Sequence, residues 1–351
     1  MMRKIEIIFC CLLFTIIVTS CSVVKISTQT GMPTAEETGL KVEEKIAQVN
    51  SITEPEISDA QIQNMEVPHN VQGALSVPTD VKYIDGLYFI VDCYHNQVIY
   101  SENLQAPLTE WYVMTDKMNR GHTIVSDGSV YLIDDTENHR ILVYQKKADK
   151  FIHTQTLTSV GTRPHYMIYD DASEAFYVLS SMTGELYVLK TADDDSVSVV
   201  DVKEIPLMQD TYCRSFTIDG DKAYFPATNG LIVQTSFPAL EVTHTYPVPD
   251  EIAGLVQVYP IGKYYYLTVS TDKEGNQDAA TIIRTTDLTQ LQAGDYEDIY
   301  DELESVRETP GTPYAISTFQ NHYYLVEHGH GHGVFQFDIQ ANQIAQVQIV
   351  Q

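Results

Sequence analysis

Several features that mark common classes of protein are scarce or missing in this 351-residue chain. Lysine and arginine number 21 against 48 acidic residues, which gives a formal charge of −27 and disfavours binding to nucleic acid or to an anionic membrane surface. The sequence has no Gly-rich phosphate loop, no nucleophile elbow and no acidic pair at a catalytic spacing. Long helical periodicity is also missing, apart from a short helix expected near residues 296–306, so a mainly helical fold is excluded.

The apolar run over residues 7–18 is too short for a comfortable membrane span. It follows Arg3 and Lys4, as the hydrophobic core of a secretory signal does. The run ends at Val18-Thr19-Ser20-Cys21, which resembles a bacterial lipobox. The resemblance implies cleavage before Cys21 and lipid (palmitate included) on that cysteine, which would anchor the protein to the extracytoplasmic face of a cell membrane. An ordinary signal peptide that happens to contain a cysteine is the alternative.

Three regions are therefore expected. Residues 1–20 form a lipoprotein signal peptide, and residues 21–70 begin with the lipidated cysteine and continue as an acidic, flexible stalk with a short helix near residues 36–49. The stalk is poor in aromatic residues and buries too little apolar surface to hold one conformation. Residues 71–351 form the folded domain.

The folded domain is expected to consist of repeats. Short apolar runs alternate with tight turns such as Ile84-Asp85-Gly86, which is the pattern of β-hairpins. The units that begin at Val77, Arg120 and Arg163 follow one another at intervals of 43 residues. Further units begin at Arg214, Leu255 and Thr312. Six units, each with room for four strands, predict an all-β, six-bladed β-propeller rather than a barrel or a pair of sandwiches, and the tail over residues 343–350 is expected to be a strand that helps to close the ring.

The segment Asp135-Thr136-Glu137-Asn138-His139-Arg140-Ile141 resembles the signature of NHL repeats, and residues 92–98 hold a degenerate copy. The resemblance implies an NHL- or gluconolactonase-like six-bladed propeller. It also implies that Asp135, Asn138 and His139 brace the turn between strands and have no catalytic role. Once the signal peptide has been removed and Cys21 lipidated, Cys93 and Cys213 are the remaining cysteines. Their blades lie on opposite sides of the ring, so we expect free thiols and no disulfide.

Equivalent positions in successive blades lie around the mouth of the central channel, because the first strand of each blade lines it. One such position holds Arg120, Arg163 and Arg214, and the position two residues later includes His122, His165 and Tyr314. Guanidinium groups suit carboxylates and phosphates, so these six residues are the predicted binding site for an anionic ligand such as an acidic sugar. The alternative is that the arginines brace neighbouring blades through carboxylates, for which the candidates are Asp92, Asp134, Asp135 and Glu327.

Two sets of histidines are candidate metal ligands. His122 and His165 suit a divalent metal such as zinc. Zinc lyases and calcium-dependent gluconolactonases resemble this fold, but their full ligand sets are not reproduced, since blade 4 has Phe216 where a third histidine would lie. The second set is His328, His330 and His332 in a glycine-rich turn, and the alternative there is a flexible turn with solvated histidines. Zinc or calcium is the candidate cofactor.

These expectations favour a membrane-anchored binding propeller that holds a small anion or an envelope protein at the channel mouth. Catalysis stays open, as a metal-dependent lyase or lactonase. A scaffold for protein interactions in the cell envelope is the third alternative, because fold alone does not determine function.

Overall fold

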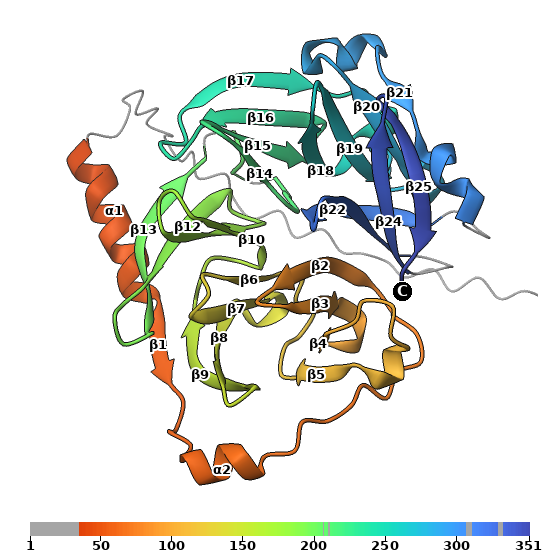
Figure 1. Ribbon diagram of the computed structural model, residues 1–351. Helices are drawn as coiled ribbons and strands as arrows, with labels where there is room; N and C mark the ends of the chain where they lie inside the picture. Colours follow the sequence, from red (N-terminus) through yellow and green to blue (C-terminus); the bar gives the residue numbers. More distant parts are fainter. Residues whose placement is uncertain (1–34, 206, 210, 307–310, 329–332) are drawn as a thin grey trace, which may run out of the picture.

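A computed structural model describes residues 35–205, 207–209, 211–306, 311–328 and 333–351. The predicted signal peptide and Cys21 lie outside these residues, as do His330 and His332. The described chain forms six sheets around a central axis, and the first strand of each sheet is innermost (Figure 1). The predicted all-β, six-bladed propeller is thereby confirmed.

Each blade is a run of four consecutive antiparallel strands. Blades 1 and 2 contain β2 (Pro78–Ile84), β3 (Leu87–Asp92), β4 (Gln97–Ser101), β5 (Tyr112–Thr115), β6 (Ile124–Ser126), β7 (Val130–Asp135), β8 (Arg140–Lys147) and β9 (Lys150–Thr158). Blades 3 and 4 contain β10 (Pro164–Asp170), β11 (Ala175–Ser180), β12 (Glu185–Thr191), β13 (Val197–Glu204), β14 (Thr217–Asp219), β15 (Lys222–Ala227), β16 (Leu231–Ser236) and β17 (Val242–Pro247). Blades 5 and 6 contain β18 (Gly254–Ile261), β19 (Tyr264–Thr271), β20 (Thr281–Thr285), β21 (Glu297–Asp298), β22 (Thr312–Phe319), β23 (His322–His328), β24 (Gly333–Gln340) and β25 (Gln343–Ile349).

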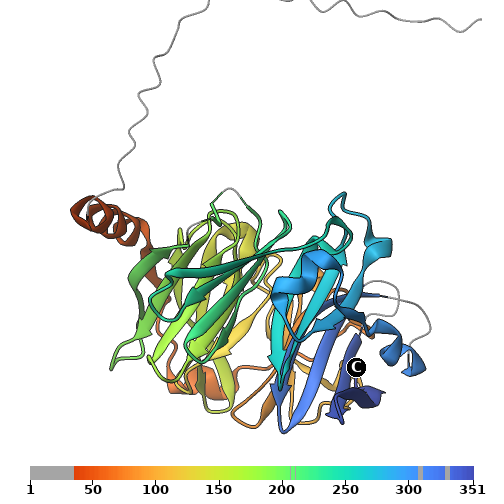
Figure 2. The ribbon, with the colours of Figure 1, turned by 90° about the horizontal axis from the view of Figure 1, so that it is seen from above.

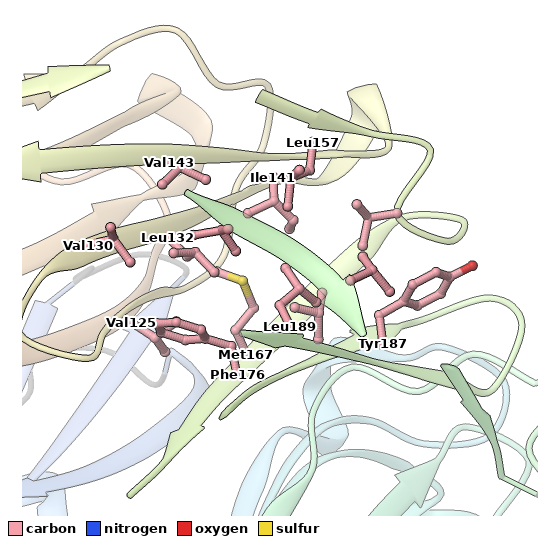
Figure 3. Close-up of a cluster of buried hydrophobic side chains, with 14 of the residues drawn as sticks. Val125, Val130, Leu132, Ile141, Val143, Leu157, Met167, Phe176, Tyr187 and Leu189 are labelled. Carbon is pink, nitrogen blue, oxygen red and sulfur yellow. The ribbon is translucent and has the colours of Figure 1, made fainter. Parts of the chain in front are cut away.

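The core lies between the blades, because successive side chains of a strand point to opposite faces of its sheet. On β7, Val130 and Leu132 face blade 3, whereas Tyr131 and Ile133 face blade 1. Figure 3 shows the first of these clusters, in which side chains of blade 2 meet Met167 and other side chains of blade 3. Both faces of a central strand are therefore buried, which explains the dense apolar runs in the sequence.

The ring closes by side-chain packing between blades 6 and 1, since every blade is built from consecutive strands. Val81 and Ile90 of blade 1 pack with Tyr324 of blade 6. The C-terminal tail forms β25, the outermost strand of blade 6. Just beyond it, the Gln351 side-chain amide donates to the Ala106 carbonyl of blade 1, 2.8 Å away. The tail thus helps to close the ring through contacts at its end.

Blade 5 departs from the repeat in its last strand. Strand β21 has two residues, and two 3-10 helices flank it, η6 (Leu288–Ala293) and η7 (Tyr300–Val306). Leu288 and Leu291 of η6 are buried against blades 4 and 5. These helices cover apolar surface that a longer outer strand covers in the other blades, which accounts for the longer spacing to blade 6.

From Ala35 onward, the segment predicted to be a stalk lies on the ring. We call residues 35–72 the N-terminal arm; its elements are α1 (Ala35–Gln48), β1 (Asn50–Thr53) and α2 (Asp59–Asn64). Figures 1 and 2 show α1 at the outer edge of the ring beside blade 3. Strand β1 adds a fifth strand to blade 2 by pairing with β9. None of the helices that the structure describes has the length and apolar content needed to cross a bilayer.

The arm is attached by polar contacts and by a few apolar side chains, of which Ile46 and Val49 pack against the core between blades 2 and 3. Lys45 of α1 forms ion pairs with Glu185 and Glu204 of blade 3, at 2.5 and 2.7 Å. Lys150 donates hydrogen bonds to three carbonyls at the end of α2, those of Ile62, Gln63 and Met65. All four residues of β1 are exposed, so its attachment comes from backbone hydrogen bonds. The low hydrophobicity of this part of the chain suggested a stalk. The pairing of β1 was not predicted, because side-chain patterns do not reveal hydrogen bonds between backbones.

Candidate binding site at the channel mouth

The NHL-like segments fix the loops at one end of the channel. Asp135 accepts hydrogen bonds from the Asn119 backbone amide, at 2.6 Å, and from the Asn138 side-chain amide, at 2.9 Å. It also pairs with Arg140, 2.5 Å away. Asp92 of blade 1 accepts from the backbone amide of Val77 in the same way, at 3.1 Å. These contacts agree with the bracing role expected for Asp135 and Asn138.

The same segments also position two of the predicted arginines. Asn96 and His139 end their turns in the left-handed conformation. The Asn96 side-chain carbonyl accepts a hydrogen bond from the Arg120 backbone amide, at 3.0 Å, and His139 Nδ1 accepts one from the Arg163 amide, at 2.9 Å. Blades 1 and 2 thus each hold the arginine of the next blade. Arg120 and Arg163 themselves have φ values of 54° and 57°, a strained backbone conformation that is concentrated at functional sites in proteins.

The three arginines line one cavity of about 230 Å³ at the channel mouth. His122, His165, Tyr314 and His328 line it as well, and so does Tyr212. The further lining residues are Val77, Thr79, Cys93, Tyr94, Ser270, Thr271, Gln277 and Thr312. Among these described residues there is no aspartate or glutamate, although acidic residues outnumber basic ones by more than two to one in the whole chain. The cavity is therefore a strongly cationic place in an acidic protein.

Each guanidinium has a different set of partners. Arg163 pairs with Glu137 at the rim, 3.0 Å away, but its Nε is buried and has no hydrogen-bond partner among the described residues. Arg214 donates to the Ser270 hydroxyl. Arg120 lies over the Tyr94 ring, at 5.1 Å from the centroid, and no described carboxylate pairs with Arg120 or Arg214. The sequence suggested four carboxylates as bracing partners. In the described structure none of these four forms an ion pair with the three arginines: Asp92, Asp134, Asp135 and Glu327. Bracing therefore applies to one of the three, through Glu137.

Tyr212 organises the cationic side of the cavity. Arg163 and Arg214 lie over its ring, with 5.8 and 5.4 Å from the guanidinium carbon to the ring centroid. Burial raises the pKa of the Tyr212 phenol, although the two arginines act in the opposite direction. Burial also raises the pKa of Tyr314 well above its usual value. Both phenols are consequently protonated at neutral pH. Because Tyr212 donates its proton to His165 Nε2, 3.0 Å away, Tyr314 is the phenol that can donate a hydrogen bond to an anion.

His165 is a neutral imidazole with a defined tautomer. Its Nδ1 lies 2.8 Å from the Arg214 carbonyl, which only accepts, so Nδ1 carries the proton. Its Nε2 is then an acceptor, 3.0 Å from the Tyr212 hydroxyl and 3.5 Å from that of Tyr314. Burial lowers the pKa of His165 well below the usual range, and nearby His122 and Arg214 lower it further.

His122 stacks on His165 with ring centroids 3.8 Å apart. Its backbone amide donates to the buried Asp134 carboxylate, at 3.0 Å, and its Nδ1 is 3.1 Å from the Thr136 hydroxyl. Gln257 on the first strand of blade 5 is buried and donates to the Ile316 carbonyl on the first strand of blade 6, at 3.2 Å.

The predicted metal sites have fewer candidate ligands in the structure than in the sequence. His328 lines the cavity, with its ring centroid 5.1 Å from that of Tyr314, but His330 and His332 lie outside the described residues. In the described parts of the chain, no three His, Cys, Asp or Glu residues form a group suited to a metal ion. Cys93 and Cys213 are buried free thiols, as expected, and burial raises the pKa of Cys93 to about 12.

The sequence did not indicate several of the lining residues. Tyr212 is the most important, and it lies in the irregular lead-in to blade 4, where the spacing between units lengthens from 43 to 51 residues. The one feature of the sequence that could have indicated Tyr212 as a lining residue is its position two residues before Arg214. Conversely, Phe216 and Gln257 occupy ring positions in the repeat but do not line the cavity. Phe216 is instead buried between blades 3 and 4, beside Tyr166.

The fold and the site together define a six-bladed β-propeller with a cationic channel mouth, whose described lining contains no carboxylate. No known protein family matches the sequence. No curated protein matches it either.

Several solved structures share the architecture. A putative 6-phosphogluconolactonase from Bacteroides uniformis has a TM-score of 0.53 at 12% identity, over 75% of this chain and 80% of that one. A catalytically inactive virginiamycin B lyase from Staphylococcus aureus, solved with quinupristin, has a TM-score of 0.53 at 14% identity, over 81% and 87%. Hydrazine synthase from Kuenenia stuttgartiensis has a TM-score of 0.52 at 15% identity, over 79% of each chain. At these identities the likeness establishes the fold alone.

Proposed function

We propose that this protein is a lipid-anchored, extracytoplasmic binding propeller that holds a small anion in the channel-mouth cavity. The observation that carries the proposal is the lining itself: three arginines, two protonated phenols and no described carboxylate. Guanidinium groups bind carboxylates and phosphates through paired, charge-assisted hydrogen bonds. The buried, unpartnered Nε of Arg163 is a donor that such a ligand would satisfy.

The size of the cavity restricts the ligand. About 230 Å³ suits a molecule smaller than a typical drug-sized ligand, such as a sugar acid or a short dicarboxylate. A sugar acid phosphate is a reasonable probe, because the name of one structural neighbour refers to that class of compound.

Calorimetric titration of the full chain with 6-phosphogluconate, gluconate and glucose tests the proposal, since these probes share a six-carbon frame and differ in charge. We expect affinity to rise with negative charge. Arg120→Gln and Arg214→Gln should each weaken binding of the phosphate about tenfold or more, because each removes a charged hydrogen-bond donor worth about 1.5–3 kcal/mol. Lys222→Gln, which removes an exposed positive charge from β15, is the matched control and should bind normally. Equal binding of all three probes, no binding at all, or an equal loss in the Lys222 variant would contradict the proposal.

An enzymatic role is the second candidate, and His165 is the observation that favours it. A neutral imidazole with Nε2 unprotonated beside two phenols is equipped for general acid–base catalysis. The lyase and lactonase among the structural neighbours make ring-opening and elimination reactions the first to screen. Turnover of a lactone or cyclic ester that is lost in His165→Gln would favour this role over binding alone.

The scaffold alternative rests on the Arg163–Glu137 ion pair, which joins blades 2 and 3. If bracing is the main role of the arginines, Arg163→Gln should lower the midpoint temperature of thermal unfolding and leave the binding of anions unchanged.

Membrane attachment is proposed from the lipobox-like residues that end at Cys21. Metabolic labelling with a palmitate analogue, compared between the natural chain and Cys21→Ser, tests it. Label that persists in the variant would contradict attachment at this cysteine.

A further inference from the structure

A second cavity lies far from the repeat-encoded ring positions, between the N-terminal arm and the outer parts of blades 1 and 2. It measures about 520 Å³. One wall consists of arm residues 54–57, 61 and 65–68, which include Ile57 and Met65. The opposite wall consists of Tyr100 and residues 113–117 of blade 1, with Tyr144 and residues 151–153 of blade 2. In Figure 1 the arm is seen passing along this side of the ring, with α2 at its outermost point.

Aromatic rings form the wall on the propeller side. Tyr100 and Phe151 meet edge to face with centroids 5.0 Å apart. Tyr144 stacks on His153 at 4.9 Å, and its hydroxyl donates to Thr115, 2.7 Å away. Burial raises the pKa of both tyrosines to about 12, so both rings are uncharged at neutral pH. The rings are therefore held in place before any ligand arrives.

The charges around this cavity are mostly negative. Its lining contains Glu54, Glu56, Glu66 and Asp116, against a single lysine, Lys117. His153 does not offset them, because burial lowers its pKa even though Glu54 acts in the opposite direction. Four carboxylates and one ammonium give the lining a charge opposite to that of the channel mouth.

The arm wall is fixed in position. Lys150 holds the carbonyl end of α2, and the antiparallel pairing of β1 with β9 holds the chain just before the cavity. On the far side, the Val113 amide donates to the Pro68 carbonyl, at 2.8 Å. The cavity is thus bounded at both ends by backbone contacts, as a preformed ligand site requires.

We propose that this cavity binds a small organic cation, of the quaternary ammonium type. A cation is attracted both by the aromatic rings of the lining and by the nearby carboxylates, whereas an anion is repelled and a neutral ligand gains no such attraction. The apolar side chains Ile57, Met65 and Ile152 suit the methyl groups of such a cation, which a small metal ion lacks.

Titration of the full chain, kept soluble with an uncharged sugar detergent, with choline and with 3,3-dimethylbutan-1-ol tests the proposal. The two probes have nearly the same shape, and only choline carries charge. We expect choline to bind at least tenfold more tightly than the alcohol, and added salt to weaken choline alone. Equal affinity for both probes, or no detectable binding of choline at its highest usable concentration, overturns the proposal.

Variants locate the binding. Glu66→Gln and Asp116→Asn, both at exposed positions, should each weaken choline binding about threefold or more and leave the fold intact. Glu274→Gln, an equally exposed acid in the turn after β19, is the matched control and should have no effect. An equal loss in all three variants means that choline senses overall charge only, and this overturns the site. Binding of 6-phosphogluconate should not change in any of them, so the outcome is independent of the proposed channel-mouth function.

Discussion

Two cavities of this protein, the channel mouth and the arm cavity, differ in how the sequence builds them and in the charge that results. The channel mouth is lined by residues at equivalent positions of successive blades, and it is cationic. The arm cavity is formed by a segment outside the repeat that lies against two blades, and it is acidic and aromatic. A propeller can thus form two cavities of opposite charge, one from its internal symmetry and one from a single appended segment.

The difference extends to the contacts that hold each site. At the channel mouth, the loops are fixed by buried carboxylates such as Asp134 and Asp135, which have no solvent exposure. In the arm, partly exposed lysines hold the chain at blade 3 and at α2. Damage to the first set of contacts should therefore affect the whole fold, and damage to the second should remain local.

Asp134→Ala should have the largest effect on stability. Asp134 accepts hydrogen bonds from the backbone amides of His122 and Thr123 and from the hydroxyls of Thr123 and Thr136. Each buried donor left without a partner costs about 1–3 kcal/mol, so the free energy of unfolding should fall by about 3 kcal/mol or more. Urea unfolding measures this, with Asp134→Asn as the milder control that keeps one acceptor. A decrease in the free energy of unfolding below about 1 kcal/mol would contradict the idea that contacts at the channel mouth support the whole fold while those of the arm act locally.

Lys150→Met should have a smaller and local effect. The substitution keeps the aliphatic stem and removes the donor to the Ile62, Gln63 and Met65 carbonyls. The opening free energy of α2 should fall by about 2 kcal/mol, as for hydrogen bonds that involve a charged group. Hydrogen exchange should accelerate in residues 59–66, while the urea midpoint of the ring stays unchanged. A drop in that midpoint as large as for Asp134→Ala would show that the arm is part of the cooperative core.

His165 should give the smallest effect, visible as a dependence on pH. Its pKa is depressed in the folded protein, mainly by burial, whereas an unfolded histidine titrates near about 6.5. The unfolded chain therefore binds the extra proton first, and stability is full above pH of about 6.5 and lost as the pH falls below it. Between pH 7.5 and 5.5, the natural protein should lose about 1 kcal/mol more than His165→Gln does. Exposed His69→Gln is the control, and equal losses in the natural protein and His165→Gln would contradict a buried neutral imidazole.

The repeat pattern made the fold and half of the candidate site predictable. Positions that recur every 43 residues place Arg120, Arg163, His122 and His165 in one cavity, because register in a sheet fixes where side chains point. Tyr212 was not predicted, because it lies in the loop before blade 4, where no strand register fixes the position of a side chain. The arm was predicted as a stalk because β1 is held by backbone hydrogen bonds, which leave no trace in side-chain hydrophobicity. The sequence also did not predict which carboxylate pairs with Arg163, because the partner is Glu137 and not one of the buried aspartates.

Anomalous diffraction from crystals soaked in selenate is the most direct test of the opposite charge of the two cavities. Selenate is a tetrahedral dianion whose selenium can be located without bias. We predict one strong peak between Arg120, Arg163 and Arg214, and none in the arm cavity beside Glu66 and Asp116. A peak in the arm cavity, or a channel mouth that stays empty at selenate concentrations that decorate other surface sites, would contradict the assignment of the channel mouth as the anion site.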